Sequence, residues 1–160
     1  DELRQGRDEI LTSCKIYKAD ADIEGVLVSP MAPKGIEVII GASRDAIFGP
    51  VLLFGLGGIF VEVLEDVAFR AIPLSRDDAR SMIDQIKARK LLDGVRGQPA
   101  VDKDALVELL LKISSIVDAH AQIAELDLNP VIAHERGCTV VDVRTIVRVL
   151  PGKFEAIENR

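Results

Sequence analysis

The chain has 160 residues, nearly half of them apolar, and a formal net charge of −6 from 20 basic and 26 acidic side chains. A chain of this length and apolar content folds as one domain with a sizeable core and is unlike a disordered chain. The acidic balance excludes a broad nucleic-acid-binding surface, although not a local basic patch. The two cysteines, Cys14 and Cys138, form no CxxC pattern. We therefore expect neither a disulfide framework nor a zinc site, as is typical of a reducing cytoplasm.

The longest uncharged run covers residues 46–61. It is shorter than the about 20 residues that a membrane-spanning helix needs, and glycines interrupt it. We interpret it as buried sheet and expect no membrane segment. The chain opens with Asp1-Glu2, without an apolar leader or an initiator methionine. This opening favours a cytoplasmic protein and a segment of a longer chain.

The first part of the chain predicts one helix and two strands. Apolar side chains on one stripe of a charged segment predict a leading helix over residues 1–18. β-Branched and apolar residues predict a strand over 24–30 and, after a loop with two prolines, another over 36–41. We expect these two strands to pair with each other.

The middle of the chain predicts a turn over 43–50, a buried strand over 51–55 and short strands over 60–63 and 66–72. The glycine-rich run 55–58 matches neither the dinucleotide fingerprint nor the P-loop. It is either a tight turn between strands or a loop whose backbone approaches another group closely.

Two helices follow. Ser75 is a good N-cap, and the acidic residues after it, with Lys87 and Arg89 farther along, predict a helix over 75–89. Asp102 is expected to cap a second, strongly apolar helix that runs to about residue 119. His120 follows as a C-terminal cap, and residues 151–160 are expected to be a polar tail.

The last elements predict a β-hairpin. Apolar and polar residues alternate over 124–133 and again over 138–144, on both sides of a polar break. A turn in the middle of this break pairs residues whose numbers sum to 271. Leu128 then faces Val143 on an apolar face, and Asn129 faces Asp142 on a polar one.

Asn129 and Asp142 are candidate ligands of a cation. Directly opposed residues have Cβ atoms roughly 5 Å apart, and oxygen ligands hold Mg²⁺ at about 2.1 Å. Asparagine is a poor strand former and Pro130 removes a backbone donor, so a ligand role would explain this dipeptide inside a strand. Asp127 is expected to form an ion pair with Arg144 beside the site. The alternative is a hairpin whose polar face is merely solvated.

Six segments carry a resemblance to a known family, and they extend over nearly the whole chain, from about residue 10 to 147. They resemble the ATP-grasp domain of ADP-forming acyl-CoA (acetate–CoA) synthetases. The same segments are more remotely similar to the β subunit of succinyl-CoA synthetase. Related ATP-grasp halves occur in multidomain protein acetyltransferases of bacteria. The segments are residues 25–32, 35–41, 48–50, 54–62, 92–97 and 125–130.

The resemblance implies an α+β fold, with residues 1–160 forming the C-terminal subdomain of an ATP-grasp domain, a mostly antiparallel sheet with packed helices. In that family ATP lies between two such subdomains. Ser29, Met31 and Ala32 fall on the hinge that meets adenine. Glu37 falls where an acidic side chain hydrogen-bonds the ribose hydroxyls.

The Mg²⁺ ligands of the family fall on Asn129 and Asp142. Asp127 is the catalytic candidate, because it stands near a glutamate that lies close to the phosphohistidine of the succinyl-CoA enzyme. The implied reaction converts acyl-CoA, ADP and phosphate reversibly into acid, CoA and ATP through a phosphohistidine. Neither His120 nor His134 lies in a matching motif for that histidine.

The resemblance also implies cofactors and partners. ATP or ADP and Mg²⁺ are the expected cofactors. The first ATP-grasp half and a CoA-binding subunit or domain are expected partners in an oligomeric assembly, and the chain alone is expected to be inactive. Because Ser29 stands where some relatives have glutamate, the alternative is a non-catalytic regulatory or assembly module, for example within a multidomain protein acetyltransferase.

Overall fold

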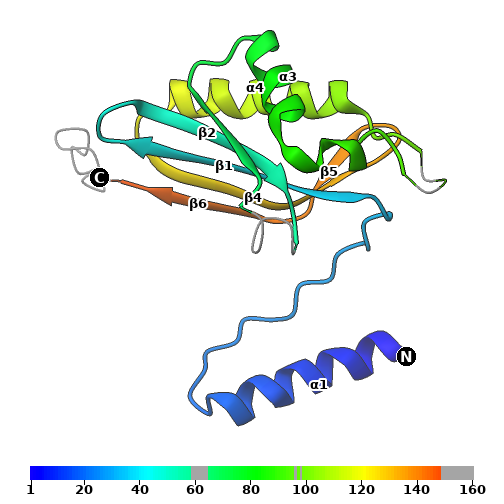
Figure 1. The fold of residues 1–160 in the computed structure, drawn as a ribbon. Helices are drawn as coiled ribbons and strands as arrows, with labels where there is room; N and C mark the ends of the chain where they lie inside the picture. The colour runs from blue at the N-terminus through cyan, green and yellow to red at the C-terminus, as the bar shows by residue number, and fades with distance from the viewer. Residues whose placement is uncertain (59–64, 96, 98, 149–160) are drawn as a thin grey trace, which may run out of the picture. The chain divides into compact units, whose positions relative to one another are not determined.

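The computed structural model describes residues 1–58, 65–95, 97 and 99–148 (Figure 1). Contacts divide the chain into two compact units, residues 1–31 and 32–160. Unit 1 contains the predicted leading helix, α1 (Glu2–Tyr17). The predicted strand over 24–30 is wrong, since this segment forms no strand and leaves Leu27 and Val28 exposed. Strand composition alone does not make a strand without a partner to pair with.

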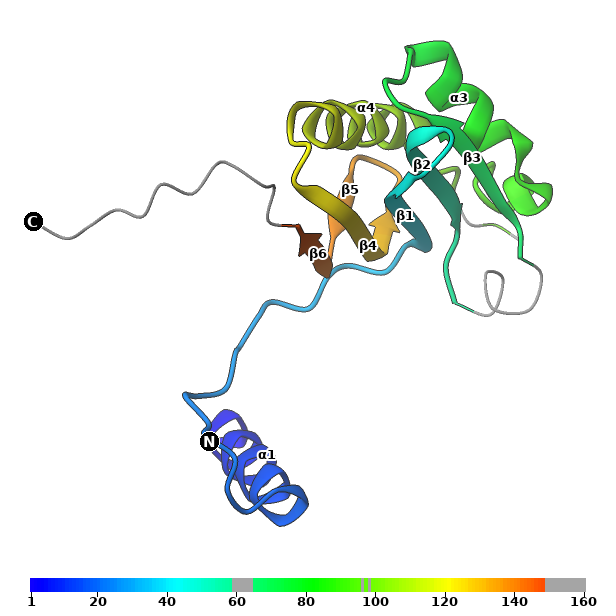
Figure 2. The ribbon, with the colours of Figure 1, turned by 90° about the vertical axis from the view of Figure 1, so that its left-hand side faces the viewer.

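Unit 2 is an antiparallel sheet with helices on one face, which confirms the predicted α+β class (Figures 1 and 2). The strand order is β3-β2-β1-β4-β5, and β6 also pairs with β4. β1 lies between β2 and β4, so the predicted pairing of β1 with segment 24–30 is wrong. The strands are β1 (Ile36–Asp45), β2 (Gly49–Leu56), β3 (Val67–Ala71), β4 (Ile123–Ala133), β5 (Cys138–Val140) and β6 (Val143–Val147).

The connection between β1 and β2 is tighter than predicted. The strands extend through most of the expected turn 43–50 and leave only residues 46–48 between them. The Asp45 carboxylate accepts hydrogen bonds from the backbone N–H groups of Ile47 and Phe48, each at 2.8 Å. These hydrogen bonds lower the pKa of Asp45 and close the turn. The predicted strand 60–63 and tail 151–160 lie outside the described residues.

Helix α3 (Arg76–Gln85) begins as predicted, with Ser75 and Asp78 forming a reciprocal capping box. It ends earlier than predicted, and a separate 3₁₀ helix, η1 (Lys87–Leu91), follows. The buried carboxylate of Asp66 accepts the backbone N–H groups of Lys87 and Ala88, each at 2.7 Å. These two bonds redirect the chain where the predicted helix would have continued.

Helix α4 (Lys103–Ala119) has both predicted caps. Asp102 accepts the backbone N–H of Ala105 at 2.9 Å, and His120 is the C-cap residue. Arg44 of β1 also caps this end, because its guanidinium donates to the carbonyl oxygens of Val117 and Ile123 at 2.7 Å and to that of His120 at 3.0 Å. One arginine thus ties β1 to the end of α4.

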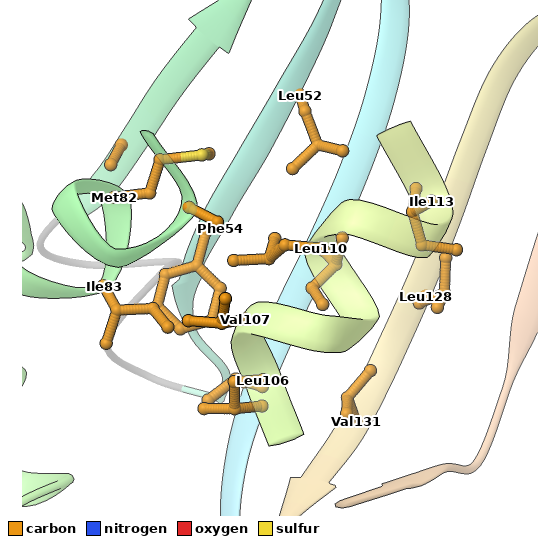
Figure 3. Packing of buried hydrophobic residues seen from close by; sticks show 14 of the residues in the cluster. Leu52, Phe54, Met82, Ile83, Leu106, Val107, Leu110, Ile113, Leu128 and Val131 are labelled. Atoms are coloured by element: carbon orange, nitrogen blue, oxygen red, sulfur yellow. The ribbon is translucent and has the colours of Figure 1, made fainter. Parts of the chain in front are cut away.

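The core lies between the sheet and helices α3 and α4 (Figure 3). Alternate residues of β1 and β2 point into it, and Phe54 and Leu110 are fully buried at its centre. Arg76 with Glu108 and Arg80 with Asp104 form exposed ion pairs between the two helices.

No described helix is both long and apolar enough to cross a membrane. Cys14 and Cys138 are free thiols.

Candidate metal centre and nucleotide site

The predicted hairpin register is confirmed. β4 pairs with β5 and β6 as one antiparallel edge, from Glu125 opposite Ile146 to Ala133 opposite Cys138, with residue numbers that sum to 271. The side chains of β4 alternate as predicted up to Asn129, so that Leu128 is buried and Asn129 is exposed; beyond Pro130 the predicted alternation is lost, and residues 131–133 are all buried. Val143 lies opposite Leu128 but stays 54% exposed, because it is on the edge strand.

Asn129 and Asp142 meet at an interruption of this edge. Asp142 lies in the two-residue gap between β5 and β6, and its carbonyl accepts the backbone N–H of Asn129 at 3.3 Å. One carboxylate oxygen of Asp142 accepts the N–H of Val143 at 2.9 Å, and no described residue donates to the other. Both side chains are exposed. The backbones of the two residues are therefore hydrogen-bonded, and each residue carries an exposed side chain, one an amide and the other a carboxylate.

The strand β4 is irregular at the same point. Its pairing with β1 shifts register between Val38 and Ile40, opposite the dipeptide Asn129-Pro130. Pro130 donates no hydrogen bond but accepts one from the N–H of Val141 at 3.0 Å. Leu128 and Val131 both point toward α4 (Figure 3), so the bulge reverses the alternation of β4. We call the sheet face away from α3 and α4, which carries Asn129, the open face.

Asp127 and Arg144 lie directly opposite each other on the open face. The predicted ion pair is wrong: among the described residues, no salt bridge within 4.0 Å joins these two side chains. Both are exposed, and an exposed ion pair gains too little to fix two solvated side chains. The register brings the residues together without joining their charges.

Glu37 also projects from the open face, where it is exposed and pairs with Ile132 of β4. Its carbonyl accepts the backbone N–H of Gly57 at 2.8 Å. A Cβ on Gly57 would lie 3.0 Å from the Cβ of Glu37, so only glycine fits without displacement. The glycine-rich run thus shows the close backbone approach that was one of its two alternatives; the residues after Gly58 that would complete a tight turn lie outside the described residues. Sequence reasoning did not connect Gly57 with Glu37, although the closely spaced glycines were the signal for it.

The three adenine-hinge candidates are divided between the units. Ser29 and Met31 belong to unit 1, and Ala32 is the first residue of unit 2. Met31 is 94% exposed and Ala32 is half-buried. Their contact with a nucleotide stays a prediction.

The hairpin is held in place by the start of α4. The Asp102 carboxylate accepts the N–H of Gly137 in the turn at 2.9 Å, and the N–H of Asp102 donates to the carbonyl of His134 at 2.8 Å. The N–H of Gly137 and, second, the N–H of Ala105 donate to this carboxylate and lower the pKa of Asp102. Burial raises the pKa of the nearby Cys138 thiol. The His134 ring nitrogen Nε2 lies 2.9 Å from Oγ1 of Thr139 in β5 and so is engaged within the hairpin.

The oxygen atoms of Asn129 and Asp142 suit a cation that is shared with a ligand. Across the described ranges, no three histidine, cysteine, aspartate or glutamate side chains are grouped so as to hold a metal ion. Mg²⁺ in proteins usually keeps several waters and is bound by one or two carboxylates together with substrate phosphates. Asn129 and Asp142 fit an ion that is shared with a phosphate ligand, and they do not form a closed protein cage.

The chain belongs to the ATP-grasp family: a family model described as an ATP-grasp domain matches residues 1–147. The β subunit of the ADP-forming acetate–CoA ligase II of Pyrococcus furiosus is 48% identical over 151 residues. The match covers 92% of this chain, which spans 64% of the relative's length.

Solved structures of one enzyme are similar as well. Dinucleotide-forming acetyl-coenzyme A synthetase 1 of Ca. Korarchaeum cryptofilum, in complex with coenzyme A, Ca-AMPCP and HgCl⁺, matches with a TM-score of 0.88 and 50% identity. That match covers 92% of this chain and 64% of the other. A second structure of the enzyme, with coenzyme A and Mg-AMPPCP, matches with a TM-score of 0.72 and 52% identity, over 74% and 55% of the two chains.

Proposed function

We propose that this chain is the nucleotide- and Mg²⁺-binding subdomain of an ADP-forming acyl-CoA synthetase. The complete enzyme would convert acyl-CoA, ADP and phosphate into acid, CoA and ATP through a phosphohistidine. Relatives named as ADP-forming acetate–CoA ligases support the reaction class. The first ATP-grasp half and the CoA-binding part would come from outside this chain, in an oligomeric, cytoplasmic assembly.

The observation that carries this proposal is the position of Asn129 opposite Asp142. The two residues interrupt the sheet at one point, and both side chains are exposed, with one carboxylate oxygen of Asp142 accepting the N–H of Val143. Glu37 lies on the neighbouring strand, opposite a residue three positions from Asn129 along β4. This separation is about 10 Å along a strand, so one extended nucleotide can reach both points.

Each residue has a role in this proposal. Asn129 and Asp142 would hold Mg²⁺, which when bound offsets charge on the phosphate oxygens. Glu37 would accept hydrogen bonds from the ribose hydroxyls, with its position fixed by the backbone of Gly57. Met31 and Ala32 would offer backbone groups to adenine, next to Ser29. Asp127 would act near the reacting phosphoryl group and not as a Mg²⁺ ligand.

The test is calorimetric titration of the complete protein with ADP, with and without Mg²⁺. We expect Mg²⁺ to strengthen ADP binding to the wild type. Asp142→Ala should reduce Mg-ADP affinity by at least about tenfold, because even the outer partners of metal ligands contribute roughly 10- to 100-fold. The Mg²⁺ dependence itself should be lost.

Asp118→Ala is the matched control. Asp118 is an exposed carboxylate near the end of α4, on the helix side of the sheet. Its removal changes the net charge equally and should leave Mg-ADP affinity within about twofold of the wild type, since exposed charges away from a site are weakly coupled to it. If the Asp142 and Asp118 variants bind Mg-ADP as the wild type does, the ligand assignment is wrong.

A further inference from the structure

We infer that Arg144 binds the terminal phosphate group of the nucleotide. This inference rests on the proposed function, because it places a further residue in the same site. Its basis is the position of Arg144 among the charges of the open face.

The described strands contain three basic residues, and two of them are engaged on the helix side of the sheet. Arg44 donates to three carbonyl oxygens at the end of α4. Arg70 donates to the hydroxyl of Ser81 on α3 at 2.9 Å. Arg144 lies on the open face, where it is exposed and has no salt bridge within 4.0 Å to a described residue. It is therefore the one basic strand residue available to a ligand there.

The rest of the open face is acidic. Its described strands and the gap between β5 and β6 carry five carboxylates: Glu37, Asp45, Glu125, Asp127 and Asp142. Asp45 is engaged in the turn that follows β1, and the other four accept no side-chain donor from a described residue. A nucleotide phosphate is itself an anion, so these carboxylates would repel it unless cations lie between them. A metal ion at Asn129 and Asp142 supplies one such charge. Within the described strands, Arg144 is the side chain that is placed to supply the other.

The geometry puts Arg144 within reach of the same phosphate. It lies two residues after Asp142, a separation of about 7 Å along an extended chain, and alternate residues share a face. It is also directly opposite Asp127, which is two residues before Asn129. A guanidinium presents a planar fork of donors that matches phosphate oxygens. The terminal phosphate would lie between the metal pair and this fork.

The absence of an ion pair between Asp127 and Arg144 agrees with this role. Opposed residues on neighbouring strands have Cβ atoms roughly 5 Å apart, which is close enough for their side chains to pair. The structure nevertheless keeps both charges apart. An arginine that is not committed to a neighbouring carboxylate loses no ion pair when an anion arrives.

The test compares ligands that differ in phosphate number. In the complete protein, Arg144→Gln should weaken Mg-ADP binding roughly 10- to 100-fold, the range for a charged hydrogen-bonding group. Binding of AMP, titrated in the same way, should change by less than about threefold, since AMP lacks the terminal phosphate. Arg144→Lys should give intermediate Mg-ADP affinity, because lysine keeps the charge and loses the fork.

Two controls separate this role from simpler ones. Arg136→Gln removes an exposed positive charge from the turn between β4 and β5 and should leave Mg-ADP affinity unchanged. If Arg144 serves only to neutralise Asp127, the double variant Asp127→Asn with Arg144→Gln would bind Mg-ADP as tightly as the wild type. Such recovery would overturn the inference.

The remaining outcomes are also decisive. If the wild type binds ADP with no dependence on Mg²⁺, the proposed function fails. If wild-type binding depends on Mg²⁺ but Arg144→Gln matches the wild type, only the role of Arg144 fails. An equal loss for AMP and Mg-ADP would show a general change of the site and would likewise overturn that role.

Discussion

The carboxylate of Asp102 accepts a hydrogen bond from the backbone N–H of Gly137, 35 residues farther along the chain, at 2.9 Å. Its other oxygen accepts the N–H of Ala105 in the first turn of α4 at the same distance. One side chain thus starts a helix and fixes the turn of the hairpin that carries both candidate metal ligands. The position of those ligands depends on this link.

Asp102→Ala should lower the melting temperature by several degrees, because the cap of α4 and the link to the turn are both lost. The folded-state pKa of Asp102 is lowered, so its carboxylate stabilises the fold above the unfolded pKa of about 4. This contribution is lost as the pH falls through the folded value. The difference in melting temperature between wild type and variant should therefore be full at neutral pH and shrink in acid.

Asp102→Asn is the control, since asparagine also caps helices but has one acceptor oxygen in place of two. Its melting temperature should lie between those of the wild type and Asp102→Ala. A difference between wild type and Asp102→Ala that stays constant from neutral pH to pH of about 3 would contradict the ionic role.

Arg44→Met should lower the free energy of unfolding by about 2 kcal/mol, because three carbonyl oxygens at the end of α4 lose a charged donor. Chemical denaturation measures this change. Arg44→Lys should recover only part of it, since an ammonium lacks the planar fork. Arg136→Met, at an exposed position of the hairpin turn, should be close to neutral; equal losses in the two methionine variants would contradict the capping role.

Gly35→Ala should destabilise the sheet by about 1 to 3 kcal/mol, the range for overpacking. A Cβ at this position would lie 2.3 Å from the carbonyl oxygen of Ala133 and 2.7 Å from Cγ2 of Ile132. Gly41→Ala is the matched variant in β1, where the nearest atom would lie at 3.8 Å. Chemical denaturation of both variants measures their free energies of unfolding. Equal values would contradict the prediction, because they would show that β4 moves to accommodate the Cβ without loss of stability.

Phe54→Ala should cost about 3 to 5 kcal/mol, because Phe54 is fully buried between the sheet and both helices. The same change at Phe48, which is 73% exposed at the turn between β1 and β2, should stay within about 0.5 kcal/mol. Thermal or chemical unfolding of the two variants gives the comparison. A large loss at Phe48 in the complete protein would instead reveal that a further part of that protein covers the turn.

Asp127→Asn should separate catalysis from metal binding. Because the proposal places Asp127 beside Asn129 and Asp142 and not among the Mg²⁺ ligands, Mg-ADP affinity should change less than about threefold. Turnover by the complete enzyme should fall roughly 100-fold, the lower range for a group that assists proton or charge transfer. Loss of Mg²⁺-dependent binding in this variant would make Asp127 a ligand.

Features of the fold that depend on residues close together in the sequence were predicted best. The cap of α3 at Ser75 and the cap of α4 at Asp102 follow from local hydrogen bonds. The hairpin register followed from the length of the polar break together with the apolar alternation, which allow only one pairing that keeps Leu128 on the core side. The position of Asn129 opposite Asp142 was therefore predictable from the sequence.

Contacts between distant segments were not predictable in the same way. Segment 24–30 has the composition of a strand, but composition does not name a partner, and β1 pairs with β4 from the far end of the chain. The early end of α3 depends on Asp66, whose position beside Lys87 and Ala88 is a tertiary contact. The ion pair of Asp127 with Arg144 failed for another reason: register brings side chains near each other, while solvation decides whether they join.

The two residues of the proposed metal site differ in how firmly the fold holds them. Asn129 lies on β4, which is hydrogen-bonded to strands on both sides, whereas Asp142 lies in the gap of the outer edge formed by β5 and β6. Edges open locally at a smaller free energy than interior strands, so Asp142 can leave Asn129 while the core stays folded. A bound Mg-nucleotide would shift this equilibrium toward the state in which Asp142 lies next to Asn129. Hydrogen exchange of the β6 amides would then slow on ligand binding far more than that of the β1 amides. The exchange rate of this edge would therefore measure how much of the site is occupied.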